Sequence, residues 1–168
     1  MLYENNTIFV FNQPLIVKVS ITNLNPNTMS TKAILAGIAG GIFLFFLGWL
    51  IFGVLLMDYY TANTTHYDGL MNEMPNLYLM IVSNLIWGLW LSFLFERWAK
   101  INSIGKGIVG GIIIGLPMIL IVDLYLLASM NLFNGTVVIL DVVANSITIG
   151  LMGGLIGFIL GWKKKAAA

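Results

Sequence analysis

Four long apolar stretches, separated by short polar segments, set the pattern of the chain. They cover about residues 33–57, 77–95, 107–130 and 137–162. About 20 residues of helix, rising about 1.5 Å each, cross a hydrocarbon core about 30 Å thick. Backbone groups in lipid must be hydrogen-bonded within their own segment, so each stretch is predicted to be a helix. The predicted fold class is therefore an all-α membrane protein, a bundle of four transmembrane helices.

From residue 29 onward, Lys and Arg lie at one end of the predicted helices. Cytoplasmic connections carry an excess of these residues, whereas the connections 58–76 and 131–136 contain none. Both termini are therefore predicted to be cytoplasmic, in a multi-pass protein of the cell inner (cytoplasmic) membrane. The cations are Lys32 before the first helix, Arg97, Lys100 and Lys106 between the second and third, and Lys163, Lys164 and Lys165 after the fourth.

The first 28 residues differ from the rest, being rich in Asn, Thr, Ile and Val. They lack the basic start, the apolar core and the cleavage site of a signal peptide. Two interpretations stay open. Residues 7–22 could form a hairpin around Asn12 to Pro14, or Met29 is the natural start and residues 1–28 are an added, disordered extension. The predicted division is an extension (1–28), a four-helix domain (29–165) and a tail (166–168).

Composition supports a lipid environment and excludes several kinds of chemistry. The chain is 59% hydrophobic and 9% charged, whereas soluble domains are about 25% charged. It has no cysteine and one histidine, which excludes disulfides, thiolate zinc sites and a multi-histidine metal site within one chain. We expect no enzyme activity, no cofactor, no metal and no nucleic-acid partner. The expected partner is the lipid bilayer.

Glycines recur at four-residue intervals in three of the predicted helices, which is typical of close helix packing in lipid. Contacts within one chain and contacts between subunits are both open, and the two can coexist. The run Gly-Ile-Ala-Gly-Gly-Ile at 37–42 also recurs as Gly-Ile-Val-Gly-Gly-Ile at 107–112, so a duplicated two-helix hairpin is one interpretation. The predicted packing residues are Gly37, Gly41, Gly48, Gly107, Gly111, Gly115, Gly153, Gly157 and Gly161.

Polar residues mark the outer half of the predicted bundle. Asp123 lies in the third helix and Asp141 near the start of the fourth. Asn84 and Asn145 lie at a similar depth, in the two helices that start at the outer side. A charge in lipid costs several kcal/mol, and no Lys or Arg lies on this side to pair with the acids. The functional interpretation is an outward-facing site for a cation, a proton or a small polar ligand.

A structural interpretation competes with it. Asp141 could cap the fourth helix near its positive end, and the asparagines could form hydrogen bonds between helices. The spacing of Asp141, Asn145, Thr148 and Met152 places all four on one face of that helix. This face is expected to contact protein or water rather than lipid.

Short motifs in the first and last helices resemble a known family. The residues that carry the resemblance are 46–53 in the first helix, and 140–141, 150–157 and Trp162 in the last. They resemble small bacterial four-helix integral membrane proteins that are catalogued as a domain of unknown function, over about residues 32–162. The resemblance implies the fold and the membrane location, but no activity.

Two functions follow from these observations. The first is a non-enzymatic membrane component that acts through helix packing or partner contacts. The second is a small carrier or channel that uses the outer polar residues, and four helices are so few that it would need a homo-oligomer. A lipid-directed enzyme is disfavoured, because the membrane segments contain no histidine or cysteine. A water-accessible cavity shared by Asp123, Asp141 and Asn145 would favour the carrier.

Overall fold

The computed structural model describes residues 2–4, 7–12, 15–20, 29–70, 72 and 74–162. Within these residues, four helices are long and apolar enough to cross a membrane, which confirms the predicted fold class. Their bounds lie within a few residues of those expected from the hydrophobic pattern. The four spans are Thr31–Leu55, Leu77–Ala99, Ile104–Ser129 and Gly135–Gly161.

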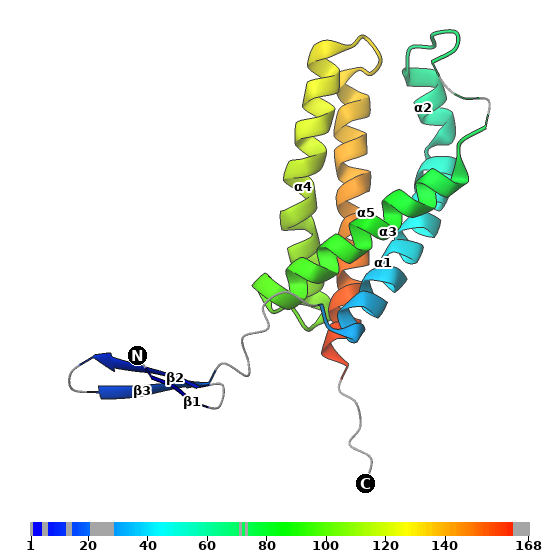
Figure 1. Ribbon diagram of the computed structural model, residues 1–168. Helices are drawn as coiled ribbons and strands as arrows, with labels where there is room; N and C mark the ends of the chain where they lie inside the picture. Colours follow the sequence, from blue (N-terminus) through cyan, green and yellow to red (C-terminus); the bar gives the residue numbers. More distant parts are fainter. Residues whose placement is uncertain are drawn as a thin grey trace.

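The described residues of the first 28 form a three-stranded antiparallel sheet in the order β1-β2-β3 (Figure 1). Strands β2 and β3 pair with Asn12 opposite Leu15, which is the hairpin suggested for residues 7–22. The assignment of Met29 as the natural start stays a prediction, and the tail 166–168 lies outside the described residues. The strands are β1 (Leu2–Glu4), β2 (Thr7–Asn12) and β3 (Leu15–Ser20).

Three of the four long helices begin with a side-chain cap. Ser30 and Asn134 cap helices α1 and α5, and Asn76 caps α3, each by accepting a backbone N–H. Helices α1 and α3 both end in a π-helical turn. The elements are α1 (Thr31–Leu50), η2 (Ile51–Leu55), α2 (Met57–Asn63), α3 (Leu77–Leu94), η3 (Phe95–Ala99), α4 (Ile104–Ser129) and α5 (Gly135–Gly161).

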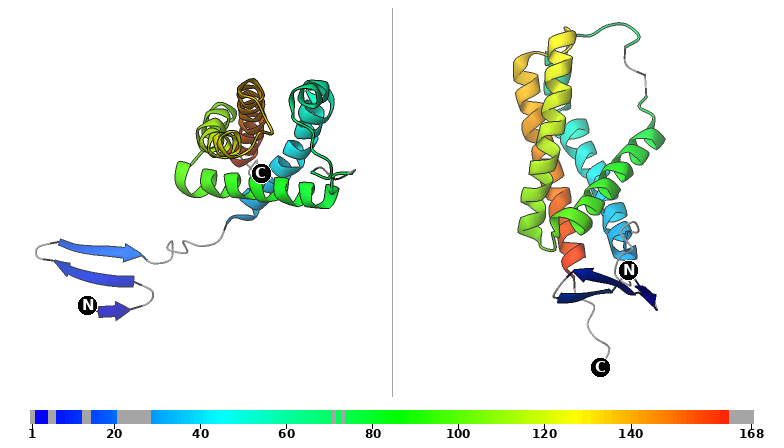
Figure 2. Two further views of the ribbon diagram at one scale, coloured as in Figure 1. Left: turned by 90° about the horizontal axis from the view of Figure 1, so that it is seen from above. Right: turned by 60° about the vertical axis from the view of Figure 1, so that its left-hand side comes forward.

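The long helices form two pairs. Helices α4 and α5 run side by side along their length, whereas α1 and α3 cross at a wide angle (Figures 1 and 2). They separate toward the end of the bundle that carries α2, which the sequence predicts to be the outer end and which is called so below. Helix α1 also packs on α5 and joins the pairs. Where α1, α3 and α5 meet, the fully buried side chains include Leu91, Phe95, Met152 and Ile156. The buried Ser92 hydroxyl donates a 2.7 Å hydrogen bond to the Ala33 carbonyl, which fastens α3 to α1.

Glycines bring the helices of each pair into backbone contact. A methyl group at Gly41 would lie 2.7 Å from the Asn84 carbonyl oxygen, and one at Gly111 would lie 2.7 Å from that of Ile149. The same holds for most of the predicted packing glycines, so these positions serve contacts within one chain. The others in close contact are Gly37 with α3, Gly107 with Gly153, Gly115 with the Ile149 side chain, Gly157 with Ser103, and Gly161 with Asn102.

Gly48 is an exception, because no contact among the described residues requires a glycine there, and its role in packing between subunits stays a prediction. No atom would lie within 4 Å of a methyl group at this position. The physical reason is the crossing of α1 and α3, because the two helices separate toward the outer end (Figure 2). The outer part of α3 is accordingly exposed, including Leu77 and Tyr78.

The two helix pairs share glycine contacts but differ in register. Gly37 packs on Gly88 and Leu89 of α3, whereas Gly107 packs on Gly153 and Gly154 of α5. If Asn84 is aligned with Asn145, Gly88 is equivalent to Ile149. The contact at Gly153 then lies four residues, or about one helical turn, further along α5. A duplicated hairpin would therefore require a slide of about one turn, or about 6 Å, between the helices of one copy.

Candidate functional site

A small cavity lies at the outer end of the bundle, among α2, α4 and α5. Its volume is about 130 Å³, and three polar side chains line it: Tyr60, Asp123 and Asp141. The rest of its wall is apolar, formed by Leu126, Phe133, Val137 and Val138. The structure therefore brings together the two membrane acids that the sequence singled out.

Asp141 has a donor on each carboxylate oxygen. The Tyr60 hydroxyl donates to Oδ1 at 2.8 Å, and the Asn145 amide donates to Oδ2 at 2.6 Å. The same amide nitrogen lies 3.2 Å from the Asp141 main-chain oxygen. Thr148 and Met152 lie about one and two turns beyond Asn145 along α5, and both are fully buried. The polar face of this helix therefore contacts protein, as its spacing predicted.

Asp123 is placed differently. Its Oδ2 atom is shielded from solvent and has no hydrogen-bond partner among the described residues. In the described part of the chain, the ion pair present is that of His66 with Asp68, at 3.8 Å on the exposed outer loop. The two carboxyl groups thus share an apolar-walled cavity without a neighbouring Lys or Arg.

Tyr60 reaches the cavity because the helix is interrupted between η2 and α2, at Leu56. In η2 the Leu56 N–H donates to the Ile51 carbonyl at 2.8 Å, and α2 then starts in a new direction. The Tyr60 ring packs edge-on against Phe52, with ring centres 6.0 Å apart. Burial raises the pKa of the Tyr60 phenol, and its hydrogen bond to Asp141 raises it further. The phenol therefore stays a hydrogen-bond donor at physiological pH.

The sequence did not single out Tyr60 as a site residue. Two adjacent tyrosines at the outer end of the first helix are typical of an aromatic belt at a membrane interface. Tyr59 is indeed exposed, whereas the Tyr60 hydroxyl points at Asp141. Which of the two turns inward depends on the break at Leu56, and no motif in the sequence marks that break.

The two outer connections close over this end of the bundle. The Thr65 N–H donates to the Leu132 carbonyl at 2.9 Å, and Thr64 forms a β-bridge with Phe133. Phe133 also lines the cavity, so the pairing of these connections positions part of its wall. The connection after α2 is thereby paired with the connection between α4 and α5.

Asn84 does not belong to this site. Its side-chain amide donates to the Met80 carbonyl of its own helix at 2.7 Å, and it does not line the cavity. The sequence placed Asn84 at a suitable depth, but α3 tilts away from α4 and α5 at the outer end (Figure 2). The expectation that Asn84 contributes to the outer polar site is therefore not met.

The size and donors of the cavity restrict what it can hold. Pockets for ordinary small molecules measure about 300–1,000 Å³, so this one suits a few waters or a small ion. Within the described residues, no group of three or more His, Cys, Asp or Glu side chains could hold a metal ion. No protein-family model, curated protein or solved structure matches the chain. The family resemblance therefore stays a prediction.

Proposed function

We propose that this multi-pass membrane protein is not an enzyme, and that its outer cavity binds a proton or a small monovalent cation between Asp123 and Asp141. The observation that carries the proposal is the Asp123 Oδ2 atom, which is shielded and unpartnered among the described residues. A carboxylate oxygen in this setting lacks a compensating donor. A bound proton or cation supplies the missing partner.

Charge balance supports the same conclusion. Two ionised carboxylates in an apolar-walled cavity repel each other, and each costs several kcal/mol to hold at membrane depth. The neighbouring donors of Asp141 are neutral, so they orient its charge without cancelling it. One added positive charge, as a proton or a cation, removes most of this cost.

The two acids have different roles in this proposal. Asp141 is held by Tyr60 and Asn145, and it supplies a fixed negative charge. Asp123 has no such fastening at Oδ2, so it carries the exchangeable proton or contacts the cation. A carrier that uses this site would need a homo-oligomer, because four helices are few for a transport path within one chain.

Carbodiimide labelling tests the proposal directly. A hydrophobic carbodiimide reacts with a protonated carboxyl group in apolar surroundings, and intact-mass measurement counts the adducts. We expect one adduct on the wild type at low pH, lost in Asp123→Asn and retained in the control Asp58→Asn, whose carboxyl is exposed outside the cavity. Labelling that is unchanged in Asp123→Asn would contradict the proposal.

The effect of alkali cations on the labelling rate distinguishes a proton site from a metal-ion site. The labelling is repeated with Na⁺, K⁺ or Li⁺ against N-methylglucamine at equal ionic strength. A site for one alkali ion predicts slower labelling with that ion, and a proton site predicts dependence on pH alone. The carrier form is tested by ion flux into proteoliposomes, and equal flux for wild type and Asp123→Asn would contradict it.

A second candidate is a membrane component that acts through a protein partner. The observation that favours it is Gly48 on α1, where no atom of the described residues outside its own helix backbone would lie within 4 Å of an added methyl group. The chain has no cysteine, so Gly48→Cys introduces a single thiol. Disulfide-linked dimers from Gly48→Cys, but not from the exposed control Ile113→Cys, would support a partner contact at this face.

A further inference from the structure

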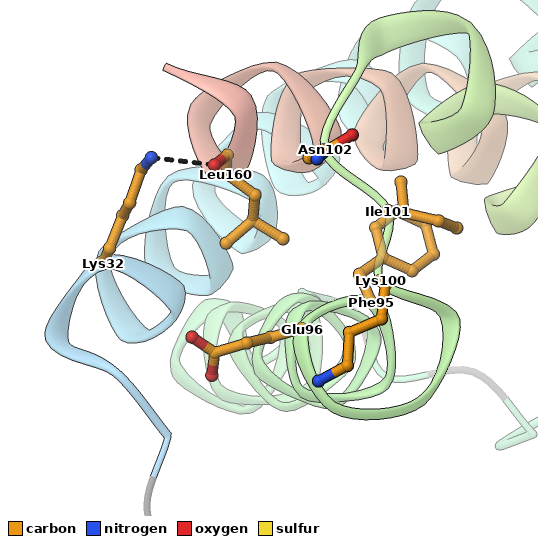
Figure 3. A pocket seen from close by; sticks show the side chains of 7 residues that line it. All are labelled: Lys32, Phe95, Glu96, Lys100, Ile101, Asn102 and Leu160. Atoms are coloured by element: carbon orange, nitrogen blue, oxygen red, sulfur yellow. Dashed lines mark hydrogen bonds between the residues drawn. The ribbon is translucent and has the colours of Figure 1, made fainter. Parts of the chain in front are cut away.

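A second hollow lies at the opposite end of the bundle, where the sequence places the cytoplasmic surface. Its volume is about 220 Å³, and it opens between the start of α1, the end of η3 and the end of α5 (Figure 3). Two lysines line it, Lys32 from α1 and Lys100 after η3. Phe95, Ile101 and Leu160 form an apolar floor.

The Lys32 ammonium group is only partly used by the protein. It donates to the main-chain oxygens of Leu160, at 2.7 Å, and Trp162, at 2.5 Å, at the negative end of α5. An ammonium group has three donors, so one remains for a further acceptor. The fastening also fixes the position of the charge at the edge of the hollow.

Lys100 is unpaired among the described residues. No carboxylate oxygen there lies within 4.0 Å of its ammonium nitrogen, and its side chain is exposed. Its backbone adopts a left-handed conformation, with φ of 50°, which ends η3 and directs the chain into α4. The turn therefore places a free cation beside the hollow.

Glu96 is the one acid that lines this hollow, and it has a partner. Its Oε2 atom accepts the Ser30 N–H at 3.1 Å, at the start of α1. The lining thus carries two positive charges and one negative charge. Further cations follow in the sequence, because Lys163, Lys164 and Lys165 come directly after α5.

We propose that this hollow binds the phosphate group of an anionic phospholipid of the cytoplasmic leaflet. Lys100 offers free donors to phosphate oxygens, and Lys32 adds positive charge at another edge of the hollow (Figure 3). Basic pockets between transmembrane helices are suited to anionic headgroups. The apolar floor accommodates the part of the lipid that joins the phosphate to its chains. This combination of charge and apolar surface favours a lipid over free phosphate, which shares the same anionic chemistry.

Native mass spectrometry of the purified full chain in neutral detergent tests this site. Phosphatidylglycerol and phosphatidylcholine with identical chains are compared, so that only the headgroup charge differs. We expect preferential retention of phosphatidylglycerol, and a loss of about fivefold in Lys100→Gln, since a lysine near anionic lipid contributes about 1 kcal/mol. Lys106→Gln is the matched control, because it removes the same charge from the same end without lining the hollow.

Glu96→Gln gives a change of opposite sign. It removes the negative charge from the lining and keeps an oxygen that accepts the Ser30 N–H, so phosphatidylglycerol retention should rise by about fivefold. A gain of binding cannot result from misfolding. Equal losses in Lys100→Gln and Lys106→Gln, equal retention of both lipids, or a loss in Glu96→Gln would each overturn the proposal.

Inorganic phosphate distinguishes the two sources of the anion. Lipid binding is measured in the presence of phosphate and, as a control, in chloride at the same ionic strength. Phosphatidylglycerol retention that persists supports the lipid as the occupant. Displacement by millimolar phosphate supports the phosphate site and overturns its assignment to a lipid.

Discussion

The Tyr60 hydroxyl donates a 2.8 Å hydrogen bond to Asp141 Oδ1, joining α2 to α5 across 81 positions of sequence. The bond orients the carboxylate at the outer cavity and holds α2 against the second helix pair. Asn145 occupies the other carboxylate oxygen from within α5. Asp141 is therefore positioned from two elements, whereas Asp123 meets it from α4.

Removing the Tyr60 hydroxyl should destabilise the protein. Tyr60→Phe keeps the ring against Phe52 and loses the hydrogen bond, so we expect a loss of about 1 kcal/mol, typical of side-chain hydrogen bonds in membrane proteins. The midpoint of unfolding in SDS titration measures it. Tyr59→Phe is the control, because Tyr59 is exposed and should change the midpoint little. Equal shifts for the two variants would contradict this role of Tyr60.

The Tyr60 phenol should ionise at a higher pH than a tyrosine in water. Its pKa is raised by burial and by Asp141, so the folded state favours the protonated phenol. The stability that it contributes is complete below the usual tyrosine pKa of about 10, and it is lost as pH rises through the raised value. Absorbance at about 295 nm follows the ionisation. Wild type and Tyr60→Phe should titrate identically near pH 10, and a smaller amplitude there in Tyr60→Phe would disprove the shift.

The two membrane acids should respond differently to amide substitution. Asp141→Asn places an NH₂ group against one of the two donors that now reach the carboxylate, so we expect a loss of about 1–3 kcal/mol. Asp123→Asn removes a charge that lacks a partner at Oδ2 and should be neutral or stabilising. The unfolding midpoints at neutral pH compare them. A larger loss in Asp123→Asn would show that the roles of the acids are reversed.

The packing glycines should tolerate no side chain, with Gly48 as the exception. Gly111→Ala would force a methyl group to 2.7 Å from the Ile149 carbonyl oxygen and should cost about 1–3 kcal/mol. Gly48→Ala meets open space and should leave stability unchanged or slightly raised. Thermal unfolding in detergent measures both. A loss in Gly48→Ala equal to that in Gly111→Ala would indicate an additional contact at Gly48.

The sequence was sufficient for features that depend on local pattern. The four helices follow from apolar length, and the glycine contacts of α4 with α5 follow from four-residue spacing, because both are properties of one helix at a time. The protein-facing side of α5 follows in the same way from the spacing of Asp141 and Asn145. These predictions needed no knowledge of how helices cross.

The parts that the sequence did not predict depend on the directions of whole helices. Asn84 has the right depth, yet the tilt of α3 carries it away from the cavity. Tyr60 enters the cavity because η2 and Leu56 redirect the chain before α2. Crossing angles and π-helical turns arise from the sum of many contacts, so neither follows from the periodicity of a single segment.

The hydrogen bonds of Lys32 to the last carbonyls of α5 also join two helices. At the end predicted to be cytoplasmic, this lysine connects α1 to α5, and at the opposite end Tyr60 connects the continuation of α1 to the same helix. The first span, with its continuation α2, is thus fastened to α5 near both of its ends. Separating the first span from α5 at either end would therefore break one of these hydrogen bonds, independently of α3.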